Sequence, residues 1–380
     1  MSAAGVPLYD HAALYASAKP RIDAAIARVL TSGKLDWGDE VPMFEAAFAD
    51  WLGASHAVGV GSGSAALKAA LKALNIGPGD EVITVTNTDI AGSSAIRFAG
   101  ADVVWVDIDP ATRNNDVARA EAAITSRTRA ILPADMYGHP ADLYALRRVA
   151  AQHGLVIIED ACLALGAEIG NRKLGTIADI TCFSFAPTKH LGAYGSAGAC
   201  TTEDPALAER LQMVSAYGQS RVRHTATFAG GGAGLYHESD GLNERMDELQ
   251  AAILLAKLPD LDATLATRRS QAARYGDRLA GSRVDLPGEH GAVLHAWRNY
   301  VVELEDRDGV RARLTERGIG TNTPYAPPMH VQPVYAALGH ALGDFPHSER
   351  SCARLMGLPL GPHLTLADID RAAEALRAVL

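Results

Sequence analysis

Short apolar runs alternate with amphipathic stretches through the first two thirds of the chain. The runs are rich in Val, Ile, Ala and Leu, which is typical of strands buried on both faces of a sheet. The stretches between them carry apolar residues at helical spacing and end at glycine-containing connections such as Asn75–Gly79 and Gly154. This alternation predicts an α/β fold, a mostly parallel sheet with helices on both faces. The predicted strands are Ala57–Val60, Glu81–Val85, Asp102–Val106, Ala130–Pro133, Leu155–Ile158 and Ile180–Phe185, and the helices between them include Ala65–Leu74, Ser93–Phe98 and Leu143–His153.

The pattern changes after residue 217. Gly218–Asp240 lacks apolar periodicity and contains three successive glycines, so we expect a long loop, which in a compact domain is usually functional. Because 380 residues exceed the usual size of one domain, we expect a large domain over residues 1–260 and a smaller α+β domain over residues 261–380. The elements predicted after the loop are, in order, helices at Met246–Leu258 and Leu261–Ala280, a strand at Arg298–Leu304, a helix at Gly309–Arg317, a Pro-rich stretch and a helix at Leu366–Leu380.

The amino-acid composition indicates which partners and which cellular location to expect. Lys and Arg total 35 and Asp and Glu total 44, so the net charge is −9 without a long run of either sign, and we expect neither a nucleic-acid surface nor a membrane patch. No window approaches the roughly 18 apolar residues of a spanning helix, and no leader pattern begins the chain. The four cysteines lack CxxC spacing, so we expect reduced, mostly buried thiols, no metal site, and a cytoplasmic protein.

A glycine and serine segment follows the first predicted strand. Gly61–Leu67 contains Gly63, Ser64 and Ala65 at the start of a predicted helix. Free amides at a helix N-terminus without bulky side chains suit a phosphate, although an N-cap that binds nothing is the commoner outcome for this pattern alone.

Two further groups stand at predicted strand ends. Asp160 follows the apolar run 155–158, where parallel sheets place ligands, and a carboxylate there can keep a ring nitrogen protonated. Lys189 lies in Ser184–His190 among small and apolar neighbours, which can lower its pKa and free its amine for imine formation. Each alone has an ordinary structural interpretation. Together, in this order, they are the parts of a pyridoxal phosphate (PLP) site.

At these residues the sequence resembles the DegT/DnrJ/EryC1/StrS family of PLP-dependent sugar aminotransferases, which have fold type I. The similarity covers nearly the whole chain, and its most specific stretches are the lysine segment and Asn243–Ala252. The resemblance implies a large PLP-binding domain with a mostly parallel sheet and a smaller C-terminal α+β domain. Other matching stretches are His56–Leu67, Glu81–Ile96, Tyr137–Pro140, Glu159–Ala167, Arg317–Gly320, Tyr325–His330 and Gln332–Pro333.

The resemblance also implies roles for single residues. Lys189 would form the Schiff base and act as catalytic base, and Asp160 would pair with the cofactor's ring nitrogen. Ser184 and the amides of Ser64 and Ala65, with Gly63 beside them, would hold the phosphate. Asn243 resembles a residue that reaches the phosphate from the partner of a homodimer, although its position also fits a helix N-cap. For the substrate, the resemblance indicates His330 and Tyr325, with Arg221, Arg223 and His224 of the long loop as candidates for a diphosphate or as an exposed basic loop.

Two positions depart from the family's pattern. The aromatic residue that usually stacks on the cofactor ring falls on Asp89, so the ring must be covered differently or the alignment shifts by one residue. The glutamine that usually follows the aspartate by three residues is Leu163, which makes no hydrogen bond.

The leading functional prediction is transamination. Glutamate or glutamine would convert PLP to pyridoxamine phosphate, which would aminate a keto group of a nucleotide-linked sugar or a cyclitol. The alternatives are a pyridoxamine-dependent sugar dehydratase, against which Lys189 argues, and a catalytically silent cofactor-binding relative, which Asp89 and Leu163 would support.

Overall fold

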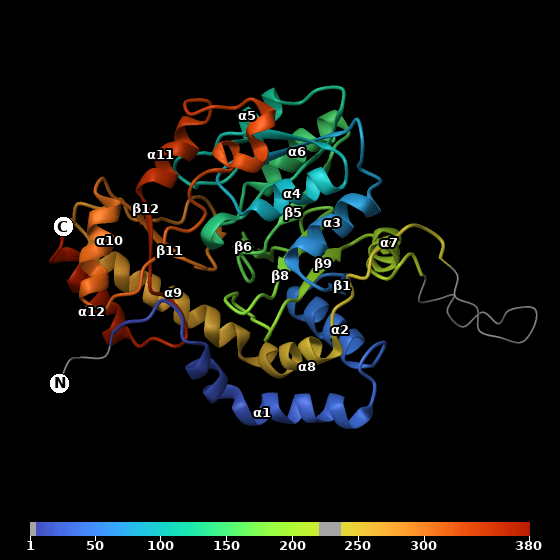
Figure 1. Ribbon diagram of the computed structural model, residues 1–380, viewed down its shortest axis with the longest axis horizontal. Helices are drawn as coiled ribbons and strands as arrows, with labels where there is room; N and C mark the ends of the chain where they lie inside the picture. Colours follow the sequence, from blue (N-terminus) through green and yellow to red (C-terminus); the bar gives the residue numbers. More distant parts are fainter. Residues whose placement is uncertain (1–4, 220–236) are drawn as a thin grey trace, which may run out of the picture.

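The computed structural model describes residues 5–219 and 237–380, and a seven-stranded sheet lies at its centre (Figure 1). The strand order is β1-β9-β8-β5-β4-β2-β3. Strand β9 runs antiparallel to both neighbours, while the four other pairings are parallel. The strands are β1 His56–Val60, β2 Glu81–Val85, β3 Asp102–Val106, β4 Thr128–Ile131, β5 Val156–Asp160, β8 Ile180–Ser184 and β9 Gly198–Thr202.

The predicted α/β class and all six predicted strands are confirmed. One strand of this sheet was not predicted, β9, because its residues continue a glycine-rich segment and carry small side chains. It pairs residue for residue between its neighbours, with Cys200 opposite Val58 of β1 and Cys182 of β8. Its antiparallel direction makes the sheet mostly rather than wholly parallel.

Alternate residues of the strands enter two hydrophobic clusters on opposite faces of the sheet. In β2, for example, Val82 joins one cluster and Ile83 the other, which is the period of a strand. One face is covered by α2 (Glu40–Leu52), α6 (Leu143–His153) and α8 (Glu248–Lys257). The other is covered by α3 (Gly63–Ala73), α4 (Ile90–Phe98) and α7 (Pro205–Ser215).

The C-terminal part has a hydrophobic cluster of its own. Tyr275 of α9 stacks on Tyr300 of β11 at 4.8 Å between ring centroids, and Val6 of the N-terminal segment joins the same cluster through its bridge to Ile319. The predicted strand and all three predicted helices are present here, and an additional strand, β12, pairs antiparallel with β11. The elements are α9 Leu261–Leu279, β11 Tyr300–Glu303, α10 Arg307–Glu316, α11 Pro346–Arg354, β12 Leu355–Leu358 and α12 Leu366–Arg377.

The N-terminal helix α1, His11–Ser32, lies along α8, where Ile22 packs on Ile253 (Figure 1). No helix in residues 5–219 and 237–380 is long and apolar enough to cross a membrane. The remaining elements are short: α5 Val117–Ala122, the strands β6 Glu168–Ile169, β7 Arg172–Lys173 and β10 Val293–Leu294, and single-turn or two-turn 3-10 helices at Met136–Gly138, Leu258–Asp260, Met329–Val331 and Pro333–Leu338.

Candidate active site

A cavity of about 280 Å³ lies at the carboxyl edge of the sheet, where β1, β2, β4, β5 and β8 all end. Chains that leave a parallel sheet at one edge bring distant parts of the sequence together, and ligands bind there. The cavity is lined by Ser62, Gly63, Ser64, Thr88, Asp89, Ala91, Ala134, Asp135, Met136, Asp160, Cys162, Leu163, Ser184, Ala186, Lys189 and Ser196. The structure therefore brings together most of the residues that the sequence suggested for a cofactor site.

Lys189 follows β8 in a tight turn, in which its amide donates to the carbonyl of Ala186 at 2.8 Å. Burial lowers the pKa of its ammonium group, and the positive charge of Arg298 lowers it further, against the opposing effect of Asp160. An amine with a lowered pKa is neutral more often and is a better nucleophile toward an aldehyde.

Asp160 is the last residue of β5 and is 8% exposed. Its Oδ1 accepts from the amide of Cys162 at 3.1 Å. Burial raises the pKa of this carboxyl group, while Cys162 and the charge of Lys189 act in the opposite direction. A buried carboxylate whose surroundings do not fully compensate its charge suits a cationic partner, such as a protonated ring nitrogen.

The opposite end of the cavity is built from small residues. Ser62 is the N-cap of α3, and its Oγ accepts from the amide of Ala65 at 3.0 Å, so that amide is occupied and Ala65 does not line the cavity. A Cβ atom on Gly63 would lie 2.8 Å from Cβ of Ser184 and 3.0 Å from Sγ of Cys162. The first amides of a helix have no partner within it, so those of Gly63 and Ser64, with Ser184 and Ser196, fit a phosphate group.

The two departures from the family's pattern both line the cavity. Asp89 is exposed and caps α4 by accepting from the amide of Ala91 at 2.9 Å. Leu163 is 7% exposed and belongs to the hydrophobic cluster of this face. One wall thus offers a carboxylate and another an alkyl side chain, where the resemblance leads one to expect an aromatic ring and an amide.

Asn243 is exposed and does not line this cavity. It pairs with Ala216 in an isolated antiparallel bridge. The expectation that it caps a helix is wrong, since α8 begins at Glu248 with Asp247 as its N-cap.

Of the expected substrate residues, Tyr325 and His330 lie in the Pro-rich stretch. Tyr325 adopts a left-handed conformation (φ 62°), and its pKa is raised by burial and affected by the charges of Arg298, Asp89 and Asp160. Tyr325 is not among the residues that line the cavity. Arg221, Arg223 and His224 lie outside the described residues.

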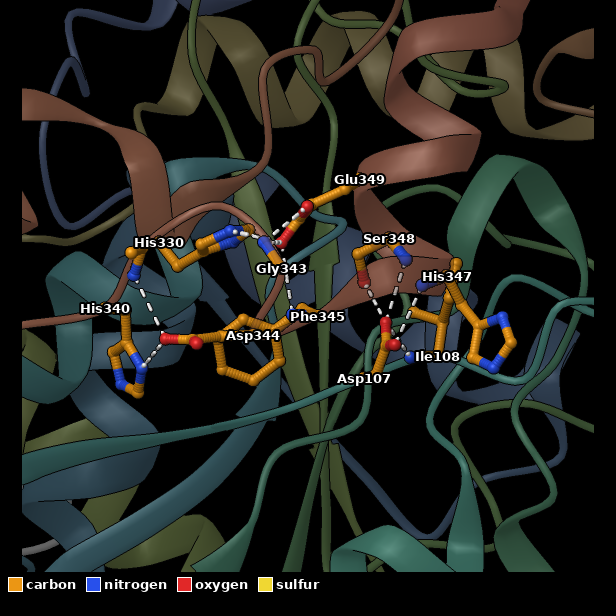
Figure 2. Close-up of polar contacts among 11 residues, drawn as sticks. Asp107, Ile108, His330, His340, Gly343, Asp344, Phe345, His347, Ser348 and Glu349 are labelled. Atoms are coloured by element: carbon orange, nitrogen blue, oxygen red, sulfur yellow. Dashed lines mark hydrogen bonds and ion pairs between the residues drawn. The ribbon is translucent and has the colours of Figure 1, made fainter.

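His330 lies elsewhere, in a polar group between the Pro-rich stretch and α11 (Figure 2). It is 1% exposed, its Nε2 lies 3.1 Å from Oε1 of Glu349, and its ring packs on Phe345. In the same view, Asp107 accepts from both the amide and the hydroxyl of Ser348, which ties α11 to the end of β3. These contacts favour a structural role for His330.

The cavity also contains residues that the sequence interpretation missed. Asp135 lies shortly after the end of β4, and Asp160 is the last residue of the neighbouring β5, so the strand-end rule could have identified Asp135 as well. Its pKa is raised well above the ordinary value by burial and by Glu159. Glu159 is itself buried and accepts from Oγ1 of Thr181 at 2.5 Å, and burial raises its pKa to about 7. Cys162 and Ser196 carry no pattern of their own and depend on the fold for their position.

These features fit PLP. When bound, PLP supplies an aldehyde for an amine and a ring that withdraws electrons from the carbon bonded to nitrogen. Lys189 would meet the aldehyde, Asp160 the ring nitrogen, and the start of α3 with Ser184 the phosphate. Among the described residues, no group of three or more His, Cys, Asp or Glu side chains is arranged to hold a metal ion.

Comparison with known proteins agrees with this interpretation. Residues 17–377 match the model of the DegT/DnrJ/EryC1/StrS aminotransferase family. The dTDP-3-amino-3,4,6-trideoxy-alpha-D-glucose transaminase of Streptomyces venezuelae is 43% identical over 373 residues, which are 98% of this chain and 95% of that protein. The crystal structure of S. venezuelae DesV in complex with a ketimine intermediate superposes with a TM-score of 0.94 at 42% identity, covering 99% and 98% of the two chains. NtdA from Bacillus subtilis, solved with bound cofactor PMP, has a TM-score of 0.91 at 31% identity and covers 100% of this chain and 85% of that one.

Proposed function

Because the chain belongs to the DegT/DnrJ/EryC1/StrS aminotransferase family, we propose that this PLP-dependent enzyme transfers an amino group from glutamate or glutamine to a keto carbon of a nucleotide-linked sugar. The observation that carries the proposal is the meeting of Lys189 and Asp160 at one cavity, beside a helix N-terminus free of bulky side chains. The relative from S. venezuelae is named for a dTDP-linked amino sugar, which supports a nucleotide carrier here.

In this proposal each residue has a distinct task. Lys189 binds the cofactor's aldehyde and then moves a proton at the carbon that gains or loses nitrogen. Asp160 keeps the ring nitrogen protonated, and Gly63, Ser64 and Ser184 hold the phosphate. The assay is a half-reaction: the holoenzyme is mixed with glutamate or glutamine, and its visible band should shift to that of pyridoxamine phosphate. If neither amino acid, nor any other amino donor, shifts the band, the aminotransferase proposal fails.

The acceptor can be sought by ligand binding. A ligand that binds the folded protein raises its apparent melting temperature by mass action. We expect dTDP- and UDP-linked sugars to raise it more than free cyclitols at equal concentration. A larger effect of the free cyclitols would contradict a nucleotide-linked acceptor.

We further propose a homodimer with shared active sites. Asn243 and the adjacent Leu242 are exposed and lie apart from their own chain's cavity, as residues that serve a partner's site would. Mixing the inactive variants Asn243→Ala and Lys189→Ala should then restore about a quarter of wild-type activity, because half of the dimers regain one complete site. Absence of any recovery after verified subunit exchange would contradict shared sites.

Two further proposals concern location and domains. The four free cysteines suit a reducing compartment, which supports a cytoplasmic enzyme. The separate C-terminal cluster supports a domain boundary near residue 260, with residues around Val6 packing on the smaller domain.

A further inference from the structure

A second cavity, of about 430 Å³, is also lined by Lys189. Lys189 is thus shared between this cavity and the candidate cofactor site. Three amine or guanidinium side chains line its wall, Lys189, Lys257 and Arg268, against one carboxylate, that of Asp260. This balance favours an anionic ligand.

Arg298 lies behind this wall and has unusual partners. It is 5% exposed, its Nη2 donates to the hydroxyl of Tyr9 at 3.3 Å, and its Nε has no partner. Tyr9 lines the second cavity together with Lys189. Among residues 5–219 and 237–380, no carboxylate lies within 4.0 Å of the Arg298 guanidinium, which is therefore a buried charge without a counterion.

The two other buried arginines in the described part of the chain both donate to strong acceptors of the protein. Arg268 resembles Arg298 in having an Nε without a partner. Arg113 donates from Nε to Glu303 at 2.7 Å. Arg268 donates to three backbone carbonyls at 3.2–3.4 Å, one of them that of Arg298 itself. A buried charge normally has a partner, because a charge that loses its hydration without gaining a partner is strongly destabilised. The partner that Arg298 lacks is therefore expected to be a ligand.

The backbone around Arg298 is held firmly. The ring of the preceding Trp297 stacks on His295 at 3.9 Å between centroids, and the carbonyl of Arg298 is bound by Arg268. The charge of Arg298 reaches the reacting centre, since it lowers the pKa of both Lys189 and Tyr325. A guanidinium whose charge acts on a nucleophilic amine is suited to orient a small anion there.

Resting on the proposed function, we propose that Arg298, assisted by Tyr9, binds the α-carboxylate of the amino-acid donor. In any α-amino acid the carboxylate carbon is two bonds from the amino nitrogen, so its anchor must lie close to the position of the Lys189 amine. The diphosphate of a nucleotide sugar is separated from the keto carbon by the sugar ring and suits a more distant and more exposed site. Arg298 thus selects the donor and leaves recognition of the acceptor to other residues.

The test compares two donors that differ only in this group. Glutamate and 4-aminobutyrate share a skeleton, but 4-aminobutyrate lacks the α-carboxylate; if glutamine is the donor, the matched amine is 4-aminobutanamide. In Arg298→Met the ratio of half-reaction kcat/KM for donor over matched amine should fall about 10- to 100-fold, because a charge-assisted interaction is lost. Arg298→Lys should recover part of the ratio. The control is Arg113→Met, a buried arginine that is paired with Glu303 and lines neither cavity, which should lower stability without changing the ratio.

A binding measurement tests this inference independently of the proposed function. In calorimetry, glutarate should bind the wild-type protein and bind Arg298→Met about 10- to 100-fold more weakly. This measurement tests the inference even if no amino donor reacts. The failure of every donor to react would overturn the proposed function but not this inference. If Arg298→Met does not fold, Arg298→Lys and Tyr9→Phe take its place, with smaller losses in the same direction.

The inference is overturned if the wild-type protein does not bind glutarate, if the variants bind it as well as the wild type, or if both donors lose activity equally. It is also overturned if the variants weaken binding of inorganic pyrophosphate but not of glutarate, since Arg298 would then serve the acceptor's carrier.

Discussion

Replacing Gly63 by Ala tests the phosphate end of the cavity with a single methyl group. The added Cβ would lie 2.8 Å from Cβ of Ser184 and 3.0 Å from Sγ of Cys162, and neither is the free end of a long side chain. Normal carbon contacts are about 3.5–4.0 Å, so the start of α3 and the end of β8 must separate by about 0.7–1.2 Å. Such overpacking costs about 1–3 kcal/mol, and it displaces the amides and the hydroxyl that we assign to the phosphate.

The assays are thermal unfolding of the cofactor-free protein and a fluorescence titration with PLP. Gly63→Ala should melt a few degrees lower and bind PLP at least about tenfold more weakly. The matched control is Gly276→Ala within α9, where a Cβ meets no atom within 4 Å and alanine favours the helix by about 0.5–1 kcal/mol. A Gly63→Ala protein that melts no lower than the wild type and binds PLP normally would refute the reasoning.

Three other predictions concern charges in and around the cavity. The folded pKa of Glu159, about 7, lies above its ordinary value of 4.5, so its contribution to stability is complete below about pH 4.5 and is lost as pH rises through about 7. Glu159→Gln should abolish a decline on the order of 2–3 kcal/mol over that window, measured by denaturation at successive pH values; an unchanged pH profile would disprove this. Asp89→Phe should bind PLP about 2- to 10-fold more tightly than Asp89→Asn, because an aromatic face adds about 0.5–1.5 kcal/mol, and weaker binding would show that the ring does not lie there. Asp89→Phe should also melt below Asp89→Asn, since asparagine keeps the cap on Ala91 and phenylalanine loses it at a cost of about 0.5–2 kcal/mol; equal melting temperatures would show that the cap contributes nothing.

Sequence patterns predicted the parts of the fold that hydrophobic periodicity determines. The six strands and the helices between them were found because buried runs and amphipathic stretches differ in period. Strand β9 was missed since Gly198–Thr202 has no large apolar residue, and its place depends on pairing with β1 and β8. The helix expected to start at Met246 begins at Glu248, an error of the size common at helix ends.

Some residues of the candidate site could likewise be predicted from sequence position, and others could not. Lys189, Asp160 and Ser184 follow strands, so sequence position alone brought them to one edge. Asp135 obeys the same rule and was overlooked. Arg298 and Tyr9 are 289 residues apart, and nothing local marks either one. Their importance comes from a missing counterion, which only the folded arrangement reveals.

The most direct test of the central claim is to locate the covalent bond to the cofactor. The protein is incubated with PLP, reduced with borohydride, digested and mapped by mass spectrometry. Lys257 provides an internal comparison, because it lines the second cavity with Lys189 and burial lowers its pKa to about 8. We predict that the cofactor mass is found on the peptide that carries Lys189, and that Asp160→Asn reduces its yield. Labelling of Lys257 or of surface lysines in place of Lys189 would contradict the account.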